Sequence, residues 1–166
     1  MSKGYKRHFL KAKEVKTLLE EASKKLKIEL DKILSPEAKV ELIKTSFGET
    51  FLINGKPCLF KLGQNLYPTL LFEEALALMP KVVVDMGAIS HICNGADVMA
   101  PGIISFEGAF NKGDLVVVID EKYSKPLVIG EILYKDDETV NIKRGVVVKN
   151  IHFVGDKIWK TLKEMS

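Results

Sequence analysis

The 166-residue sequence has few of the side chains that build disulfide frameworks or metal sites. Its two cysteines, Cys58 and Cys93, do not form a CxxC pair, so neither a disulfide framework nor a structural zinc site is expected. His91 stands two residues before Cys93 on an expected helix, so the two side chains point to different sides and do not share a metal. We expect two buried thiols, no metal and no cofactor.

The sequence also lacks long hydrophobic runs and catalytic motifs. No apolar stretch approaches the roughly 20 residues that cross a bilayer, and the first residues, MSKGYKRHFLKAK, lack the apolar core of a signal peptide. Glycine-rich phosphate loops are absent, and no histidine has a Ser or Cys nucleophile at a recognisable motif spacing. We predict a cytoplasmic globular protein that is not an enzyme and does not bind a membrane.

Positive charge is modest overall and unevenly placed along the chain. The formal net charge is +3, but the residues up to Lys27 include nine basic and three acidic side chains, whereas the residues from Lys81 onward include eleven basic and twelve acidic ones. A basic surface attracts phosphate. The outer face of an amphipathic helix is polar in any case, so the basic N-terminal helix is either a solvated face or a surface that contacts RNA or protein.

Arginine is scarce, with only Arg7 and Arg144 among 25 basic residues. The guanidinium group binds phosphate or base edges through two parallel hydrogen bonds, whereas lysine acts as a point charge. Arg144 is therefore a candidate contact residue. The alternative is that it remains by chance in a lysine-rich sequence.

The chain divides near Pro80 and Lys81. In the first part, Asn54 and Gly55 predict a type I′ hairpin turn between two strands. Apolar periodicity predicts a helix at 12–27, a short turn at 30–34, antiparallel strands at 39–45, 49–53 and 56–62, and a helix at 69–79.

The second part is rich in short strands after one helix. They are predicted at 102–107, 114–119, 126–134, 141–143 and 146–153, a spacing that favours a β-barrel over a parallel sheet. The final segment, GDKIWKTLKEM, is a short helix or a strand pair, and Trp159 is expected to plug the barrel end. The predicted fold class is α+β.

The segment VVVDMGAISHICNGADVMAPGII, at 82–104, begins with a β-branched run that predicts a buried strand. Asp85 then supplies an acceptor for the free amides of a helix that starts near Gly87. Asn94 and Gly95 predict the end of this helix, because a left-handed turn is easy for Gly and tolerable for Asn. This combination resembles the signature of a PUA RNA-binding domain.

A longer stretch, LYPTLLFEEALALMPKVVVDMGAISHICNGADVMAPGI, and GVVVKNIHFVGDKIW near the end resemble the malignant T-cell amplified sequence (MCT) proteins, in their archaeal form. The resemblance implies an N-terminal α/β pre-PUA domain at 1–80 followed by a C-terminal PUA β-pseudobarrel at 81–166. It also implies RNA binding in translation, on the small ribosomal subunit and near the tRNA acceptor end, with a translation-factor partner in eukaryotes.

The resemblance further places an RNA-binding surface on the helix after the first PUA strand, on the following turn and strand, and on the next-to-last strand. In this sequence these positions are Gly87, Ala88, His91, Gly95, Ala96, Asp97, Met99, Ala100, Pro101, Lys143, Arg144 and Gly145. Glycine allows close approach of a ribose-phosphate chain, small side chains leave room for a base, and the two cations neutralise phosphate. As alternatives, Gly95 is only a helix cap, His91 a surface residue and Met99 a core filler.

Three functions agree with these residues. The leading hypothesis is a non-catalytic RNA-binding translation factor that acts in initiation or recycling. The second is an accessory protein that delivers tRNA or rRNA to a separate modification enzyme. The third is a protein-interaction adaptor without RNA binding, which the net charge of −1 from Lys81 onward keeps open.

Overall fold

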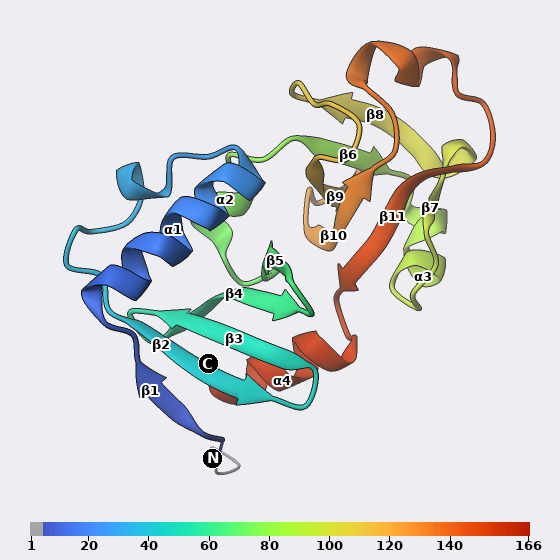
Figure 1. The fold of residues 1–166 in the computed structure, drawn as a ribbon. Helices are drawn as coiled ribbons and strands as arrows, with labels where there is room; N and C mark the ends of the chain where they lie inside the picture. The colour runs from blue at the N-terminus through green and yellow to red at the C-terminus, as the bar shows by residue number, and fades with distance from the viewer. Residues whose placement is uncertain (1–4) are drawn as a thin grey trace. The chain divides into compact units, whose positions relative to one another are not determined.

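The computed structural model describes residues 5–166 in two units (Figure 1). Lys3, one of the basic residues counted above, lies outside the described residues. Unit 1 comprises the described residues up to Leu78 together with Lys160–Ser166, and unit 2 comprises Met79–Trp159. The last seven residues were predicted to belong to the second domain. The structure groups them with unit 1, where Leu162 is fully buried.

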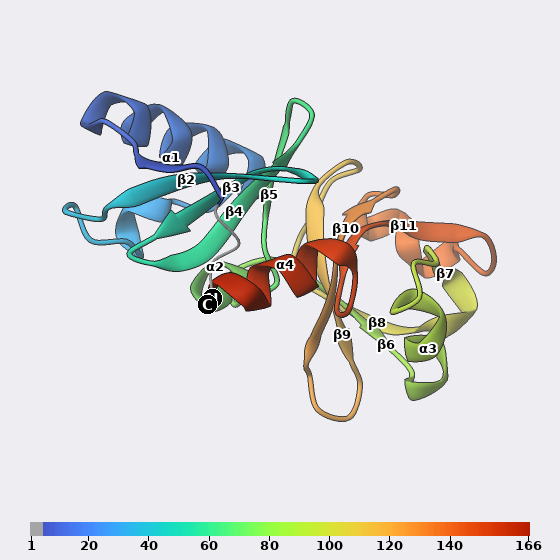
Figure 2. The same cartoon turned by 90° about the horizontal axis from the view of Figure 1, so that it is seen from below.

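Unit 1 is a five-stranded antiparallel sheet with a helix across one face (Figure 2). Its strands follow chain order and are β1 (Arg7–Phe9), β2 (Val40–Thr45), β3 (Gly48–Ile53), β4 (Lys56–Leu62) and β5 (Asn65–Pro68). Helix α1 (Ala12–Leu26) buries Leu18, Ala22 and Leu26, which share its inner face. The predicted hairpin is confirmed, because Asn54 and Gly55 both have positive φ, at 52° and 84°.

Two strands and one helix of unit 1 differ from the prediction. Strands β1 and β5 were not predicted, since both are short. The helix predicted at 69–79 is wrong in length, because α2 covers only Glu73–Leu76. The Thr69 hydroxyl accepts a hydrogen bond from the Leu71 N–H at 3.1 Å, and the Phe72 N–H donates to the Thr69 carbonyl at 3.2 Å. These bonds form a turn where the apolar pattern alone indicated helix. The 3-10 helix η1 (Leu30–Lys32) lies within the predicted turn.

Unit 2 is a six-stranded sheet with the order β7-β11-β10-β9-β6-β8. The strands are β6 (Lys81–Val84), β7 (Val98–Met99), β8 (Ile103–Glu107), β9 (Leu115–Asp120), β10 (Pro126–Ile132) and β11 (Val146–Phe153). Strands β6 and β9 run parallel, and every other pairing is antiparallel. Buried side chains from β6, β9, β10 and β11 form its hydrophobic core. The whole chain is therefore α+β, as predicted.

The strand predicted at 141–143 is wrong. The chain instead forms the 3-10 helix η4 (Asp136–Asn141) and then a loop that leads into β11. At the start of this helix Glu138 accepts a hydrogen bond from the Lys135 N–H at 3.0 Å. Asp136 accepts from the N–H of the distant Phe110 at 3.1 Å, which attaches the helix to another segment of unit 2. Lys143, Arg144 and Gly145 therefore lie in a loop and not in a strand.

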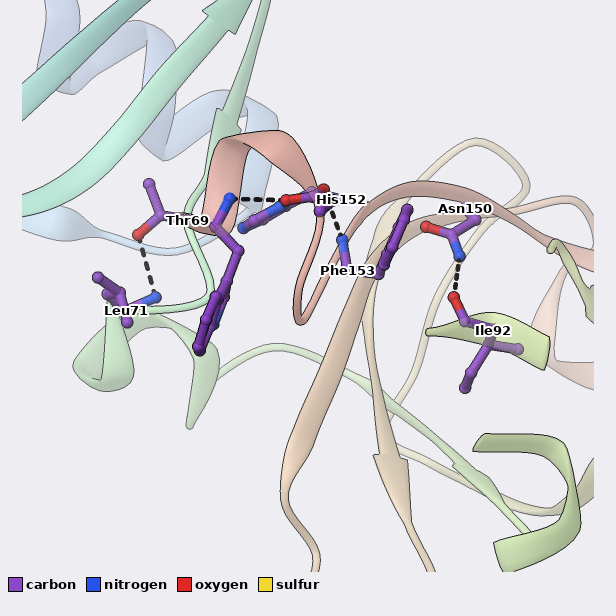
Figure 3. Close-up of polar contacts among 8 residues, drawn as sticks. Thr69, Leu71, Ile92, Asn150, His152 and Phe153 are labelled. Atoms are coloured by element: carbon purple, nitrogen blue, oxygen red, sulfur yellow. Dashed lines mark hydrogen bonds and ion pairs between the residues drawn. The ribbon is translucent and has the colours of Figure 1, made fainter. Parts of the chain in front are cut away.

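The final segment is a helix, α4 (Lys157–Met165), which resolves the alternative left open by the sequence. Asp156 caps it by accepting from the Trp159 N–H at 2.6 Å, and its other oxygen lies 2.9 Å from Nδ1 of the buried His152 (Figure 3). Trp159 itself is half-buried, and its role as a plug stays a prediction. Within residues 5–166 no helix is both long and apolar enough to cross a membrane.

Candidate functional site

The first strand of unit 2 leads directly into a short helical segment held by Asp85. After β6 the chain forms the 3-10 helix η2 (Met86–Ala88) and then α3 (Ile89–Ile92). The Asp85 carboxylate accepts a hydrogen bond from the Ala88 N–H at 2.9 Å, and the Asp85 N–H donates to the Gly102 carbonyl at 3.0 Å. The predicted cap is confirmed, and it fixes where the helical segment begins.

Gly95 ends this helical segment, as the sequence predicted. Its φ is 99°, a conformation that residues with a Cβ rarely adopt. The N–H groups of Gly95 and Ala96 donate to the carbonyls of Ile92 and His91 at 3.2 and 3.1 Å, which satisfies the end of the helix. The helix-cap interpretation of Gly95 therefore holds. It does not exclude a second role.

The loop after Gly95 is tied to β11 by Asn150 and Asp97. The Asn150 side-chain amide donates to the carbonyl of Ile92 at 2.9 Å (Figure 3). The same amide also donates to the carbonyl of Ala96 at 2.9 Å. Asp97 Oδ1 accepts from the Asn150 backbone N–H at 2.8 Å. These three bonds hold a loop of exposed residues in one conformation before any ligand binds.

The helical segment, this loop and the next strand surround a cavity of about 570 Å³, which we call the first cavity. Seven of the predicted site residues line it: Gly87, Ala88, His91, Ala96, Asp97, Met99 and Pro101. Asp85, Ile92, Val98 and Gly102 complete its walls. Residues from three short elements and their connecting turns thus come together at one place.

The remaining predicted residues lie outside the first cavity. Ala100 opens the 3-10 helix η3 (Ala100–Gly102), and its N–H donates to the Gly145 carbonyl at 2.9 Å. Gly145, with φ of 87°, therefore lies directly beside the β7–η3 segment, and the exposed Lys143 and Arg144 precede it. Gly95 does not line the cavity.

The first cavity is acidic and apolar, and neither Lys143 nor Arg144 lines it. Its titratable side chains are Asp85, His91 and Asp97, and no lysine or arginine lines it. One oxygen of each aspartate is used by the backbone bond described above, so the other oxygen is available as an acceptor. A carboxylate accepts hydrogen bonds from ribose hydroxyls or exocyclic amines and repels phosphate. The cavity therefore suits a nucleoside better than a phosphate group.

Two residues of this region were not predicted in the roles that they have: Asp85 as a lining residue and Asn150 as a structural one. Asp85 was interpreted only as a cap, although it directly follows β6 and therefore lies at the carboxyl end of that strand, where it lines the first cavity. Asn150 gave no sequence signal, because its partners are more than fifty residues away in the chain. Within residues 5–166 no group of three or more His, Cys, Asp or Glu side chains is arranged to hold a metal ion.

Two family models match consecutive parts of the chain. A family model described as the PUA domain matches residues 80–154, and one described as a domain of unknown function, DUF1947, matches residues 6–73. The first match contains the first cavity and the loop formed by Lys143, Arg144 and Gly145, which we call the cationic loop.

Similar proteins extend over nearly the whole chain. An uncharacterized protein of Methanocaldococcus jannaschii is 39% identical over 93% of this chain and 95% of its own length. Translation machinery-associated protein 20 of Saccharomyces cerevisiae is 31% identical over 90% of this chain and 84% of its own length. Malignant T-cell-amplified sequence 1-A of Xenopus laevis is 30% identical over 69% and 67% of the two chains.

A solved structure agrees with these matches. The crystal structure of a hypothetical protein of Pyrococcus horikoshii superimposes with a TM-score of 0.80 at 34% identity and covers 95% of this chain and 99% of that one. The protein therefore belongs to the family of the malignant T-cell-amplified sequence and translation machinery-associated 20 proteins, in which a pre-PUA domain precedes a PUA domain.

Proposed function

We propose that this protein is a non-catalytic, cytoplasmic RNA-binding factor of the translation machinery. The RNA would be small-subunit rRNA or the acceptor end of tRNA, and the step initiation or recycling. The RNA-binding part of the proposal is supported by the PUA match, and the link to translation by the names of the relatives. Unit 2 would bind the RNA through the twelve residues that the sequence singled out.

The observation that carries the proposal is the arrangement of seven of these residues around one preformed cavity. Two cations, Lys143 and Arg144, precede Gly145, whose carbonyl accepts a hydrogen bond from Ala100 beside the cavity wall. The first cavity accepts a base and its sugar, while Lys143 and Arg144 neutralise the phosphates that follow. Gly145 carries no side chain, and a Cβ placed there would meet no atom within 4 Å. A ribose-phosphate chain therefore has room to pass over it. Recognition of this kind reads the shape of an RNA end more than its sequence.

Unit 1 would orient unit 2 on the ribosome or on a partner translation factor. Helix α1 exposes Lys13, Lys16 and Lys24 opposite its buried side. Exposed lysines attract an rRNA backbone or an acidic partner. Both uses agree with a factor that holds an RNA end in a defined place.

The test is crosslinking of the tagged chain to RNA in its native host, followed by sequencing of the attached fragments. Fragments from small-subunit rRNA or tRNA acceptor stems are expected. If tRNA or rRNA is recovered together with a modification enzyme, the accessory function replaces the proposed one. If no RNA rises above the untagged control, the proposal is wrong and the protein is an adaptor.

A further inference from the structure

We propose that unit 2 has a second nucleotide subsite, which binds the base that neighbours the one in the first cavity. This inference rests on the proposed function. It concerns a separate cavity of about 390 Å³, which we call the second cavity. Its walls are strand β8, the helix η4 with the loop that follows, and single residues of η3 and β11.

The two cavities lie on opposite sides of the β7–η3 segment. Met99 and Pro101 line the first cavity, whereas Ala100, between them, lines the second. Lys143 lines the second cavity as well, and Gly145 accepts the hydrogen bond from Ala100. The predicted RNA-binding residues are thus shared between two cavities, with the cationic loop beside the segment that separates them. A strand of RNA that crosses this segment reaches both.

The second cavity runs along a free edge of the sheet. Four consecutive residues of β8, from Ile103 to Phe106, line it. Side chains of a strand alternate between two faces, so a cavity that touches four in a row follows the strand edge. Strand β8 pairs with β6 on one side, and within the described residues no strand pairs with its other side. Its outward N–H and C=O groups provide the donors and acceptors that read the edge of a base.

Exposed aliphatic side chains border the second cavity and give a base its apolar contact. Ile104 is 55% exposed and Val140 is 73% exposed, although both are large hydrophobic residues. The half-buried Ile142 supplies further apolar surface, and Lys143 is the only charged residue in the lining. The volume of about 390 Å³ lies within the range of small-ligand pockets, about 300–1,000 Å³. The lining combines these aliphatic contacts with the polar groups of Ser105, Thr139 and the β8 backbone. The absence of carboxylates from this lining allows the phosphate of the bound nucleotide to lie near Lys143.

The subsite is tested with RNA hairpins whose 3′ single strand is lengthened one nucleotide at a time. The V140D and I104D variants place a negative charge on exposed side chains of the second cavity, where the fold tolerates it. The matched control is Y123D, which adds the same charge at an exposed aromatic residue of unit 2 that lines neither cavity. Binding is measured by fluorescence anisotropy for the wild type and the three variants.

We expect the wild type and Y123D to bind more tightly as the single strand lengthens enough to reach the second cavity. V140D and I104D should bind the shortest RNA like the wild type but lose the gain, by about tenfold. A photoreactive thiouridine at the corresponding position should crosslink to peptides that contain 103–106 or 139–143. If both variants follow the wild type on every RNA, the second subsite is wrong while the proposed function stands. If the wild type binds none of the RNAs, the proposed function fails first.

Discussion

The side-chain amide of Asn150 donates a hydrogen bond to the backbone carbonyl of Ala96 at 2.9 Å, which fixes a loop of the first cavity to strand β11. A second bond from the same amide to Ile92 secures the end of α3. One polar side chain therefore joins the helical segment, the loop and the sheet. The loop is built in advance, so RNA binding does not have to order it.

The first prediction concerns this connection. Replacing Asn150 by Ala removes two hydrogen bonds, leaves the Ala96 carbonyl without its protein partner and leaves the Ile92 carbonyl with only the Gly95 N–H. The free energy of unfolding should fall by about 2 kcal/mol. RNA affinity should fall as well, because the loop becomes mobile. Urea unfolding and anisotropy measure both effects. The control N111A removes an exposed amide of unit 2 that lines neither cavity and should change neither quantity; equal losses in both variants would contradict the connection.

The second prediction concerns the cationic loop. Replacing Lys143 and Arg144 by Ala should weaken RNA binding and reduce its dependence on salt. The slope of log affinity against log salt is negative, and each phosphate that is no longer neutralised reduces its magnitude by about 0.7. The measurement is RNA affinity at several salt concentrations. The control variant carries Ala at Lys112 and Lys125, which are exposed cations of unit 2 away from both cavity linings. An unchanged slope in the first variant would remove the loop from the RNA site.

The third prediction concerns Gly95. Valine at this position must adopt φ near 99°, which costs about 1–3 kcal/mol, and its side chain approaches the Phe153 ring, because a Cβ there lies 3.6 Å from it. Both stability and RNA affinity should fall. Gly113 has a similar φ of 93° with open space around it, so G113V should lose stability but keep RNA binding. Normal RNA affinity in G95V would show that Gly95 serves only as a helix cap.

The fourth prediction concerns stability in acid. Asp120 is buried, which by itself opposes ionisation, but hydrogen bonds from the N–H groups of Tyr123, Lys125 and Lys122 outweigh this and lower its pKa below the ordinary value of 3.8. A lowered carboxyl pKa stabilises the folded state above 3.8, and the contribution disappears as the pH falls through the folded-state pKa.

Replacing Asp120 by Asn should therefore lower the free energy of unfolding at pH 7 by about 2 kcal/mol, because an amide cannot accept all three bonds. The difference between wild type and variant should shrink toward pH 3. Urea unfolding at both pH values measures it. D137N, at an exposed carboxylate, is the control and should behave like the wild type. A difference that stays constant with pH would contradict the ionised state of Asp120.

The fifth prediction concerns the thiols. Burial raises the pKa of the Cys58 thiol to about 12, and the charge of Glu74 adds to this effect; burial also raises the pKa of Cys93. Because the thiolate is the reactive form, both cysteines should react slowly with a disulfide reagent at pH 8. Cys93, which is half-buried, should react before the buried Cys58. The urea-unfolded protein is the control, in which both should react at once.

Much of the fold follows from local patterns in the sequence. The apolar stripe of α1, the hairpin at Asn54 and Gly55, the cap at Asp85 and the helix end at Gly95 all depend on neighbours within a few residues. The helix at 69–79 and the strand at 141–143 were predicted wrongly because side chains there form hydrogen bonds with the backbone that the apolar pattern does not indicate. Thr69 turned an expected helix start into a turn, and Asp136 with Glu138 turned the approach to an expected strand into a 3-10 helix.

The candidate site likewise has features that local sequence predicts and features that depend on tertiary contacts. The sequence by itself determined the helical segment, the left-handed glycines and the candidates around them, because the resemblance and the turn chemistry are contained in the chain. Only the tertiary structure decided that seven of the twelve candidates surround one cavity and that Ala100 and Lys143 line another. It also decided that Asn150 attaches the loop after Gly95 to strand β11. These relations depend on strand pairing between segments that lie about fifty residues apart, and no local pattern records which strands will pair.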